Sequence, residues 1–276
     1  MTPPTLTSPL GLVAGSGFLP LEFLRAAKDA GHEVLVVAHR DETSPEIEKL
    51  TSRCLWVRVG QLGKIVSFFR NSGVKQLAFA GGIKRARIFR EVWPDMLALQ
   101  LAARLGSLRD DVLLRGVVAE FEKLGIQVIS PGVLLKSCHP QVGQLTKRGL
   151  TEAELADARL GWEAAHGIGA LDIGQAVCVL DRAVVAVEAV EGTDRMLLRA
   201  HDLAGRAGVL VKLAKPQQDL RIDLPAVGPA TIETMRRAGA TALILEAGRA
   251  IMLEPGEMLS AAEAAGIAIV AFEAQP

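Results

Sequence analysis

Short apolar runs alternate with helical stretches through the first half of the chain, and this alternation constrains the fold more than any other feature. The apolar runs occupy 10–14, 33–38, 54–59, 76–80 and 126–129. Stretches with helical periodicity, such as 19–30 and 62–71, lie between them and end near glycines. Strands separated by helices are typical of βαβ units. We therefore predict an α/β protein whose residues 1–135 form a Rossmann-like nucleotide-binding domain with a mainly parallel sheet.

The second half mixes a hairpin with helices. Thr151 and Glu154 have the spacing of a capping box at the start of a helix. Two apolar runs within 175–187 flank Asp181-Arg182 and predict a β-hairpin. A strand pair is expected around 247–249. This mixture predicts that residues 136–276 form a second, catalytic α/β domain with a mixed sheet.

The charge balance excludes several classes of protein. The 276 residues contain 31 Lys and Arg and 31 Asp and Glu, whereas nucleic-acid binders usually carry a basic excess. No apolar run reaches the ~18–20 residues that cross a membrane. The N-terminus has no signal-peptide core, and the three cysteines lack CxxC spacing. We therefore expect a cytoplasmic protein without a zinc site or a disulfide framework.

The first glycine cluster, Gly15-Ser16-Gly17, follows an apolar run and precedes a helix. Such a turn brings backbone N–H groups and a helix dipole toward a phosphate. It is a poor dinucleotide fingerprint, because Pro20 stands at the third glycine position. Moreover, Ala38-His39-Arg40 stands where an acid is expected at the end of the second strand. Two interpretations stay open: a tight turn that needs glycine, and a turn that contacts a nucleotide.

A second cluster, Gly81-Gly82-Ile83-Lys84-Arg85, also follows an expected strand. Ligands of open α/β sheets bind outside the carboxyl ends of the strands. The glycines would allow close backbone approach, and the two cations suit a phosphate. The alternative is a solvated basic loop.

The segment 212–229 carries the most chemistry. If it is extended, Asp219, Arg221 and Asp223 share one face, and alternating apolar residues share the other. Carboxylates are natural Mg²⁺ ligands, and cations neutralise a reacting diphosphate. Residues four apart in a straight strand lie ~13 Å apart, so either the chain bends here, which the prolines permit, or the two acids have separate roles. An exposed ion-pair array on a loop is the alternative.

A further acidic group spans Glu188, Glu191, Thr193 and Asp194. Thr193 or Asp194 is predicted to cap the helix that follows, and the acids could also face the same site. The common hydrolase frameworks are absent, including Walker A, Gly-x-Ser-x-Gly and His-Glu-x-x-His.

Taken together, six ordered motifs resemble one family almost end to end. They are Leu-Val-Ala-Gly15-Ser16-Gly17-x-Leu-Pro20, Gly81-Gly82-Ile83-Lys84-Arg85, 158–163, 172–177, Glu188-x-x-Glu191-Gly192-Thr193-Asp194 and 215–231. The chain resembles the UDP-2,3-diacylglucosamine pyrophosphatases of lipid A biosynthesis that are unrelated to the calcineurin-like enzymes. Gln217 and the lack of a glycine before Asp110-Asp111 depart from the pattern.

The resemblance implies a Mg²⁺-dependent hydrolase that converts UDP-2,3-diacylglucosamine to 2,3-diacylglucosamine 1-phosphate (lipid X) and UMP. Water would attack the β-phosphorus. The family implies two domains with the ligand between them, a homodimer, and a cytoplasmic location compatible with peripheral contact at the inner face of the inner membrane.

Residue roles follow from the same resemblance. Asp223 is the first choice for the essential acid and metal ligand, and Asp219 is the second. Arg221, Lys212 and Lys215 would compensate phosphate charge. Predicted substrate contacts are Gly15, Ser16, Gly17, Gly81, Gly82, Lys84, Glu191, Thr193 and Asp194.

Two other functions stay open. A nicotinamide-dependent oxidoreductase is disfavoured by Pro20 and by the missing acid. A non-catalytic UDP-sugar sensor or carrier would use the same residues, although carboxylates beside a diphosphate are unfavourable for a pure anion binder without a metal ion.

Overall fold

The chain folds into two compact units. The computed structural model describes residues 5–83, 92–106, 110–222 and 224–276. The first unit comprises residues 1–136 together with 219–223, and the second comprises 137–218 and 224–276. The chain therefore leaves the second unit for a short stretch at 219–223 and then returns to it.

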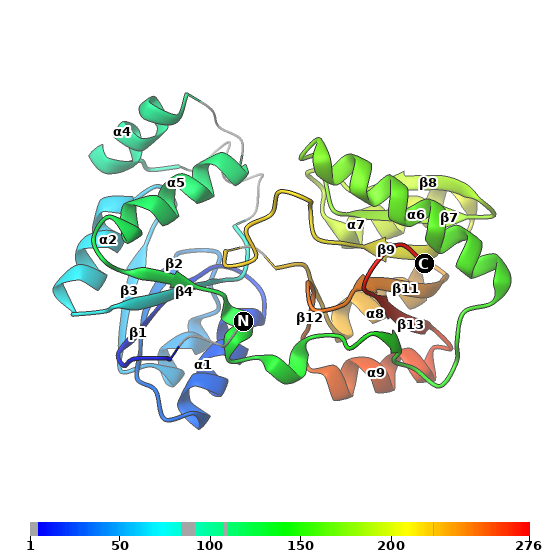
Figure 1. Cartoon of the computed structure of the whole chain (residues 1–276), viewed down its shortest axis with the longest axis horizontal. Helices are drawn as coiled ribbons and strands as arrows, with labels where there is room; N and C mark the ends of the chain where they lie inside the picture. The colour runs from blue at the N-terminus through cyan, green and yellow to red at the C-terminus, as the bar shows by residue number, and fades with distance from the viewer. Residues whose placement is uncertain (1–4, 84–91, 107–109, 223) are drawn as a thin grey trace. The chain divides into compact units, whose positions relative to one another are not determined.

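A parallel five-stranded sheet forms the centre of the first unit (Figure 1). Its strands are β1 (Leu10–Ala14), β2 (Val34–His39), β3 (Arg53–Val57), β4 (Gln76–Ala80) and β5 (Gln127–Ile129). They lie in the order β3-β2-β1-β4-β5, and each neighbouring pair is parallel. The predicted Rossmann-like sheet is confirmed. The strand order reverses between β1 and β4, which makes this edge a topological switch point.

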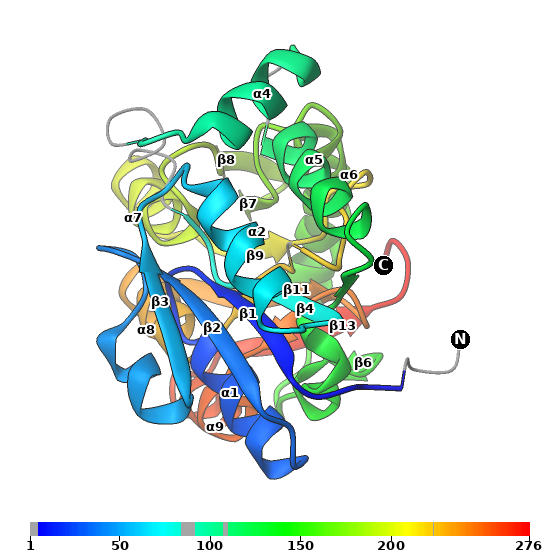
Figure 2. The ribbon, with the colours of Figure 1, turned by 90° about the vertical axis from the view of Figure 1, so that its left-hand side faces the viewer.

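Helices cover both faces of this sheet (Figures 1 and 2). They are α1 (Leu19–Asp29) on one face and α2 (Leu62–Asn71), α4 (Met96–Leu105) and α5 (Asp110–Glu122) on the other. The core on the α2 face includes Phe69, Leu77 and Phe121, all 0% exposed. Ile222 also belongs to this core, although it lies about 100 residues further along the chain than the helices it packs with.

A six-stranded mixed sheet forms the second unit. Its strands are β6 (Gly143–Gln144), β7 (Ala176–Leu180), β8 (Ala183–Val187), β9 (Gly208–Lys212), β11 (Ala240–Glu246) and β13 (Ala268–Phe272). The order is β6-β13-β11-β9-β7-β8. The strands β13, β11 and β9 are parallel to one another. β6 pairs antiparallel with β13, β7 pairs antiparallel with β9, and β8 pairs antiparallel with β7. The predicted mixed sheet and the β7–β8 hairpin are both confirmed.

Helices also lie on both faces of the second sheet. They are α6 (Glu152–Ala170), α7 (Thr193–Ala204), α8 (Pro229–Arg237) and α9 (Pro255–Ala264). On one face Trp162 of α6 joins valines of β7 and β9 in a single core. The opposite core contains Met196, Met235 and Met258, one from each of the other three helices. The capping box of α6 is present, with Glu154 N–H donating to Thr151 Oγ1 at 3.2 Å.

The strand pair expected around 247–249 is wrong. Residues 247–249 form the turn after β11, and the next strand, β12 (Ile251–Met252), pairs in parallel with β10 (Ala226–Val227) in a separate two-stranded sheet. The reason is topological, because β9 and β13 already occupy both edges of β11. Ile251 therefore donates its N–H to Pro225 O at 2.8 Å instead.

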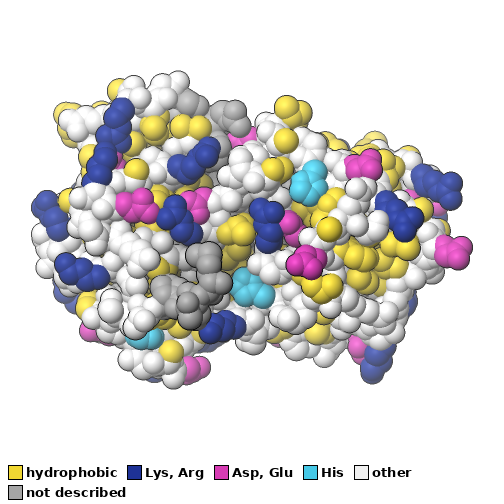
Figure 3. All heavy atoms as spheres, viewed as in Figure 1, with side chains coloured by type: hydrophobic (Ala, Val, Ile, Leu, Met, Phe, Trp, Pro, Cys, Tyr) yellow, Lys and Arg dark blue, Asp and Glu magenta, His cyan; other side chains and the backbone are white. Residues whose placement is uncertain are grey.

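The surface carries both signs of charge. On the face shown in Figure 3, basic and acidic side chains are interspersed, and neither sign forms a continuous patch. Among the residues described, no helix combines the length and the apolar content that a membrane crossing needs.

Candidate functional site

Two glycine turns meet at the carboxyl edge of the parallel sheet. Gly15-Ser16-Gly17 follows β1, and Gly81-Gly82 follows β4. Ser16 donates twice to the carbonyl oxygen of Gly82, from its backbone N–H at 2.7 Å and from its hydroxyl at 2.8 Å. The two turns therefore form one structure at the switch point, which is where open α/β sheets bind ligands.

Two of these glycines are required by the contact between the turns. A Cβ on Gly15 would lie 2.4 Å from Gly82 O, and a Cβ on Gly81 would lie 2.2 Å from Ser16 O. Gly17 is different, because its φ is +88° and a Cβ there would meet no atom within 4 Å. The tight-turn interpretation thus explains Gly15 and Gly81, and nucleotide contact stays a prediction for the cluster. Lys84 lies outside the described residues.

A buried histidine stands where a dinucleotide fold would carry its acid. His39 ends β2, and its ring Nδ1 lies 2.9 Å from Ala14 O, at the end of β1. Thr43 Oγ1 donates to the same carbonyl at 2.7 Å. Burial lowers the pKa of the His39 imidazole below its usual range, so the ring is neutral near pH 7. His39 therefore holds the β2 loop against β1 and supplies no positive charge.

In the second unit, Lys212 lies at the centre of a buried polar network. It ends β9 and is 7% exposed. Its ammonium donates to Thr193 Oγ1 at 3.1 Å and to Ala226 O at 3.0 Å. Thr193 in turn donates to Glu188 Oε1 at 2.8 Å. The network thus links β9, the start of α7, the end of β8 and β10.

The acidic residues around α7 do not act as one group, because each has a different environment. Glu191 accepts from Arg199 at 2.5 Å, and Asp194 is exposed in the first turn of α7. The predicted capping by Thr193 or Asp194 is wrong: Gly192 is the N-cap, and no side chain caps the helix. Thr193 is instead the first residue of α7, and its hydroxyl donates to Glu188 Oε1.

Lys215 is held by a buried ion pair. Its ammonium lies 2.5 Å from Asp172 Oδ1, and the two side chains are 11% and 8% exposed. The backbone N–H of Lys215 also donates to Gln218 Oε1 at 2.8 Å. Gln217, the departure from the family pattern, donates to Gly169 O at 2.8 Å. These contacts fix the chain just before it enters the first unit.

The segment that follows is bent. Asp219 Oδ1 accepts from the backbone N–H of Arg221 at 3.0 Å, and Ile222 N–H donates to Asp219 O at 2.9 Å. The chain therefore turns at 219–222 and is not extended there, and whether the two acids share an ion stays a prediction. Asp223 lies outside the described residues.

Within this bend, Asp219 and Arg221 form a bidentate pair. Arg221 Nε and NH2 approach the two Asp219 oxygens at 3.1 Å or less, and NH1 lies 2.9 Å from Glu122 of α5. Hydrogen bonds from Arg221 lower the pKa of Asp219 below its usual range. Asp219 is therefore ionised at neutral pH and is a weak base.

The described residues do not form a complete side-chain metal site. Among them, no group of three or more His, Cys, Asp and Glu side chains comes together. Both Asp219 oxygens already accept from Arg221, which competes with a cation for them.

Two acids in these networks were given no individual role by the sequence. Asp172, which was not considered, pairs with Lys215. Glu188, noted only as a member of the acidic group, accepts from both Thr193 and the Gln175 N–H. Both stand inside the motifs that carry the family resemblance. Only their position inside these motifs could have pointed to the two acids, because the sequence shows no spacing that identifies the partner of either one.

Comparison with known proteins gives one end-to-end relative. The UDP-2,3-diacylglucosamine pyrophosphatase LpxI of Caulobacter vibrioides is 36% identical over 280 residues, which cover 96% of this chain and 98% of that protein.

Solved structures add little. The biotin carboxylase domain of Hydrogenobacter thermophilus 2-oxoglutarate carboxylase is 16% identical with a TM-score of 0.29, over 71% of this chain and 41% of that one. The protein gox2253 is 13% identical with a TM-score of 0.33, over 94% of this chain and 75% of that one. Neither similarity supports an inference.

Family models match both halves. The LpxI N-terminal domain matches residues 9–138, and the LpxI C-terminal domain matches residues 141–270. The two matches run in the family's own order and leave only short ends uncovered. Together with the relative from Caulobacter, they show that this chain belongs to the LpxI family.

Proposed function

We propose that this protein hydrolyses the diphosphate of UDP-2,3-diacylglucosamine to 2,3-diacylglucosamine 1-phosphate (lipid X) and UMP in lipid A biosynthesis. The observation that carries the proposal is the end-to-end similarity to the Caulobacter pyrophosphatase, at 36% identity over 96% of the chain. The glycine turns support it, since exposed backbone at a switch point suits a nucleotide.

We propose further that the reaction needs Mg²⁺ and that water attacks the β-phosphorus. Mg²⁺ is usually bound through one or two carboxylates together with the substrate's phosphates, so one or two acids are sufficient. Asp223 is the proposed essential acid, with Asp219 second. Arg221, Lys212 and Lys215 would contribute positive charge toward the phosphates, directly or through the positions they hold.

The test is hydrolysis in ¹⁸O-labelled water. The purified protein is incubated with UDP-2,3-diacylglucosamine and Mg²⁺, with and without EDTA, and the products are identified by mass spectrometry. EDTA-sensitive release of UMP with label in the lipid phosphate is the expected result. Label in UMP instead would contradict attack at the β-phosphorus.

Asp223→Ala tests the role of the acid. We expect turnover to be abolished while the fold and UDP-sugar binding persist. Asp202→Ala, which removes an exposed acid of α7, is the matched control and should leave turnover unchanged. Normal activity in Asp223→Ala would contradict the assignment, and substrate binding without turnover in the wild type would favour a sensor or carrier.

Assembly and location are separate proposals. We expect a homodimer in the cytoplasm that contacts the inner face of the inner membrane, where a lipid-linked substrate is found. Light scattering after gel filtration tests the first, and flotation with vesicles of inner-membrane lipids tests the second.

A further inference from the structure

The apolar residues of helix α4 are not confined to its buried side. Of its ten residues, Gln100 and Arg104 are the two polar ones. The inner side, which includes Leu101, packs against the core beside α2 and α5. The outer side carries Met96 and Leu99, which are 68% and 51% exposed. A surface helix usually presents polar residues outward, so the outer side of α4 has the composition of a contact surface.

The exposed apolar surface continues ahead of the helix. Residues 92–94 are exposed, and Trp93 is 58% exposed. Trp93 N–H donates to Val59 O at 2.9 Å, and Asp95 N–H donates to Gly60 O at 3.1 Å. Figure 3 shows hydrophobic side chains at the surface over α4. Because its backbone is held in this way, the segment presents a large indole at the surface without a rearrangement.

Within 92–106 no acid is exposed. Asp95 is the single acid of this stretch and is half-buried. Its Oδ1 accepts from Ala98 N–H of α4 at 3.1 Å, and its Oδ2 accepts from Gly63 N–H of α2 at 2.7 Å. The carboxylate is therefore committed to the first turns of two helices and is not part of the exposed surface.

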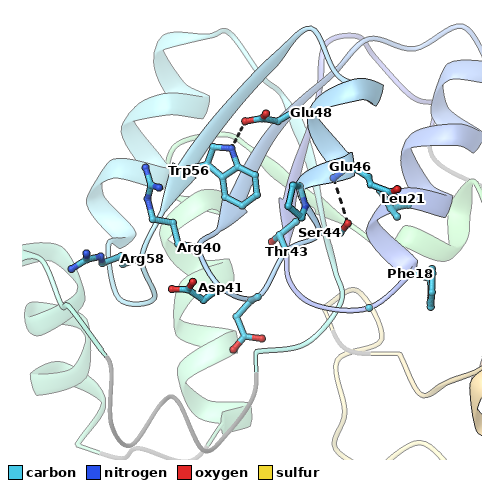
Figure 4. A pocket seen from close by; sticks show the side chains of 13 residues that line it. Phe18, Leu21, Arg40, Asp41, Thr43, Ser44, Glu46, Glu48, Trp56 and Arg58 are labelled. Carbon is cyan, nitrogen blue, oxygen red and sulfur yellow. Dashed lines mark hydrogen bonds between the residues drawn. The ribbon is translucent and has the colours of Figure 1, made fainter.

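Arg58 places a positive charge beside the exposed indole. Its guanidinium lies 4.8 Å from the centre of the Trp93 ring. Figure 4 shows the Arg58 side chain directed away from the ring of Trp56. A tryptophan beside a cation suits the boundary between lipid headgroups and acyl chains, where indole rings are enriched and arginine meets phosphate.

Two more cations lie beyond the other end of this surface. Arg104 and Lys123 both pair with Glu120, and their side chains are 53% and 55% exposed. Two positive charges share one carboxylate, so this end keeps a net positive charge. An apolar face bordered by cations is complementary to a bilayer that carries anionic lipids. A second copy of the chain fits less well, because a twofold contact would bring the same cations of both copies together.

We propose that α4 and residues 92–94 dock on the surface of an anionic lipid bilayer. Trp93, Met96 and Leu99 enter the headgroup region, and the bordering cations contact lipid phosphates. That this bilayer is the inner membrane rests on the proposed function, whose substrate is lipid-linked. The docking itself needs no substrate.

The test is co-sedimentation of the full-length protein with vesicles of phosphatidylethanolamine and phosphatidylglycerol. Met96→Glu should weaken partitioning at least tenfold, because a carboxylate must enter an apolar and anionic region. Met96→Leu keeps the apolar contact and should stay within about threefold of wild type. Leu203→Glu is the matched control, because it adds the same charge at a 66% exposed position of α7, and it should leave binding unchanged.

A second variant tests the cations. Arg58→Gln should weaken binding to anionic vesicles about threefold to fivefold and leave the weaker binding to phosphatidylcholine vesicles unchanged. Salt at about 0.5 M should weaken the binding of the wild type to anionic vesicles, because it screens surface charge. Thermal unfolding of each variant confirms that the first unit is folded.

The outcomes separate docking from hydrolysis and from self-association. Vesicle binding that Met96→Glu weakens, in a protein that hydrolyses nothing, would support the docking surface and contradict the hydrolase. Equal vesicle binding by wild type and Met96→Glu, or none by wild type, would overturn the docking and leave the hydrolase standing. Loss of a dimer in Met96→Glu, measured by light scattering, with unchanged vesicle binding would assign the surface to a second copy and also overturn the proposal.

Discussion

The predicted site residues differ in kind between the two units: exposed glycines in the first and buried charged side chains in the second. In the first unit, most of the predicted residues after β1 and β4 are glycines, and Gly17, Gly81 and Gly82 are exposed. In the second unit, the corresponding residues are charged side chains such as Lys212 and Glu188, which are both 7% exposed. A backbone surface is available to a ligand as it stands, whereas the side-chain network already satisfies its own hydrogen bonds.

This difference indicates a division of labour. The first unit has the features of a binding surface, because exposed glycine backbone needs no rearrangement to meet a ligand. The second unit has the features of a support, because the ammonium of Lys212 holds Thr193 and the Ala226 carbonyl three residues beyond Asp223. The four predictions that follow test this contrast, beginning with the largest expected effect.

Gly15→Ala tests whether backbone packing builds the first edge. A Cβ at this position would lie 2.4 Å from Gly82 O, so the two turns must separate. We expect the first unit to lose about 3 kcal/mol of stability and nucleotide binding to be lost. Chemical denaturation followed by hydrogen exchange of 10–17 measures this. Gly256→Ala is the control, because a Cβ there meets no atom within 4 Å. Equal losses of stability in both variants would contradict the claim that close backbone contact builds this edge of the first unit.

Ile222→Ala tests how the short segment 219–223 is held in the first unit. Ile222 is 8% exposed in the core beside α2 and α5, so its truncation should cost about 2 to 3 kcal/mol and increase hydrogen exchange at 219–222. Glu122→Gln breaks the exposed pair with Arg221 and should cost less than about 0.5 kcal/mol. The reverse order would mean that ion pairs, and not apolar packing, hold the segment.

Lys212→Met tests whether side chains support the second unit. It keeps the apolar length but leaves the Ala226 carbonyl and Thr193 without their donor, and we expect a loss of about 2 kcal/mol of stability. Exchange should rise in β10 and at the start of α7. Lys147→Met, which removes an 89% exposed lysine paired with Glu263, should change little. A Lys212 variant of unchanged stability would instead point to an ammonium that acts mainly on substrate.

Acid should weaken the second unit through Glu154. Burial opposes its ionisation, but hydrogen bonds from Arg148 and Thr151 lower its pKa from 4.5 to about 2. Because the pKa is lower in the folded protein, this contribution is complete above about pH 4.5 and disappears as the pH falls toward 2. We expect Glu154→Gln to cost about 1 kcal/mol near pH 7, with the difference from wild type narrowing below pH 4.5. Thermal unfolding across pH measures it; a difference that stayed constant would contradict the assignment.

Local patterns in the sequence predicted the elements well. The parallel sheet, the β7–β8 hairpin and the Thr151–Glu154 capping box depend on periodicity and on residues a few positions apart, and all three are confirmed. Pro20, which replaces the third glycine of a dinucleotide fingerprint, lies in the first turn of α1, where proline is tolerated.

Features set by distant contacts could not be predicted. The pairing of β12 with β10 depends on β11 having both edges filled. The pairs Lys215–Asp172 and Lys212–Thr193 join residues 43 and 19 positions apart, and no spacing rule connects them.

The return of 219–223 to the first unit limits how this protein can be divided. A chain that ended at residue 136 would contain every strand of the parallel sheet but would lack Ile222, and the core beside α2 and α5 would have a gap. A chain that began at residue 137 would carry the same isoleucine without the core that buries it. The two halves are therefore not interchangeable modules: recombination at the apparent boundary would transfer a sheet without one of its own core residues.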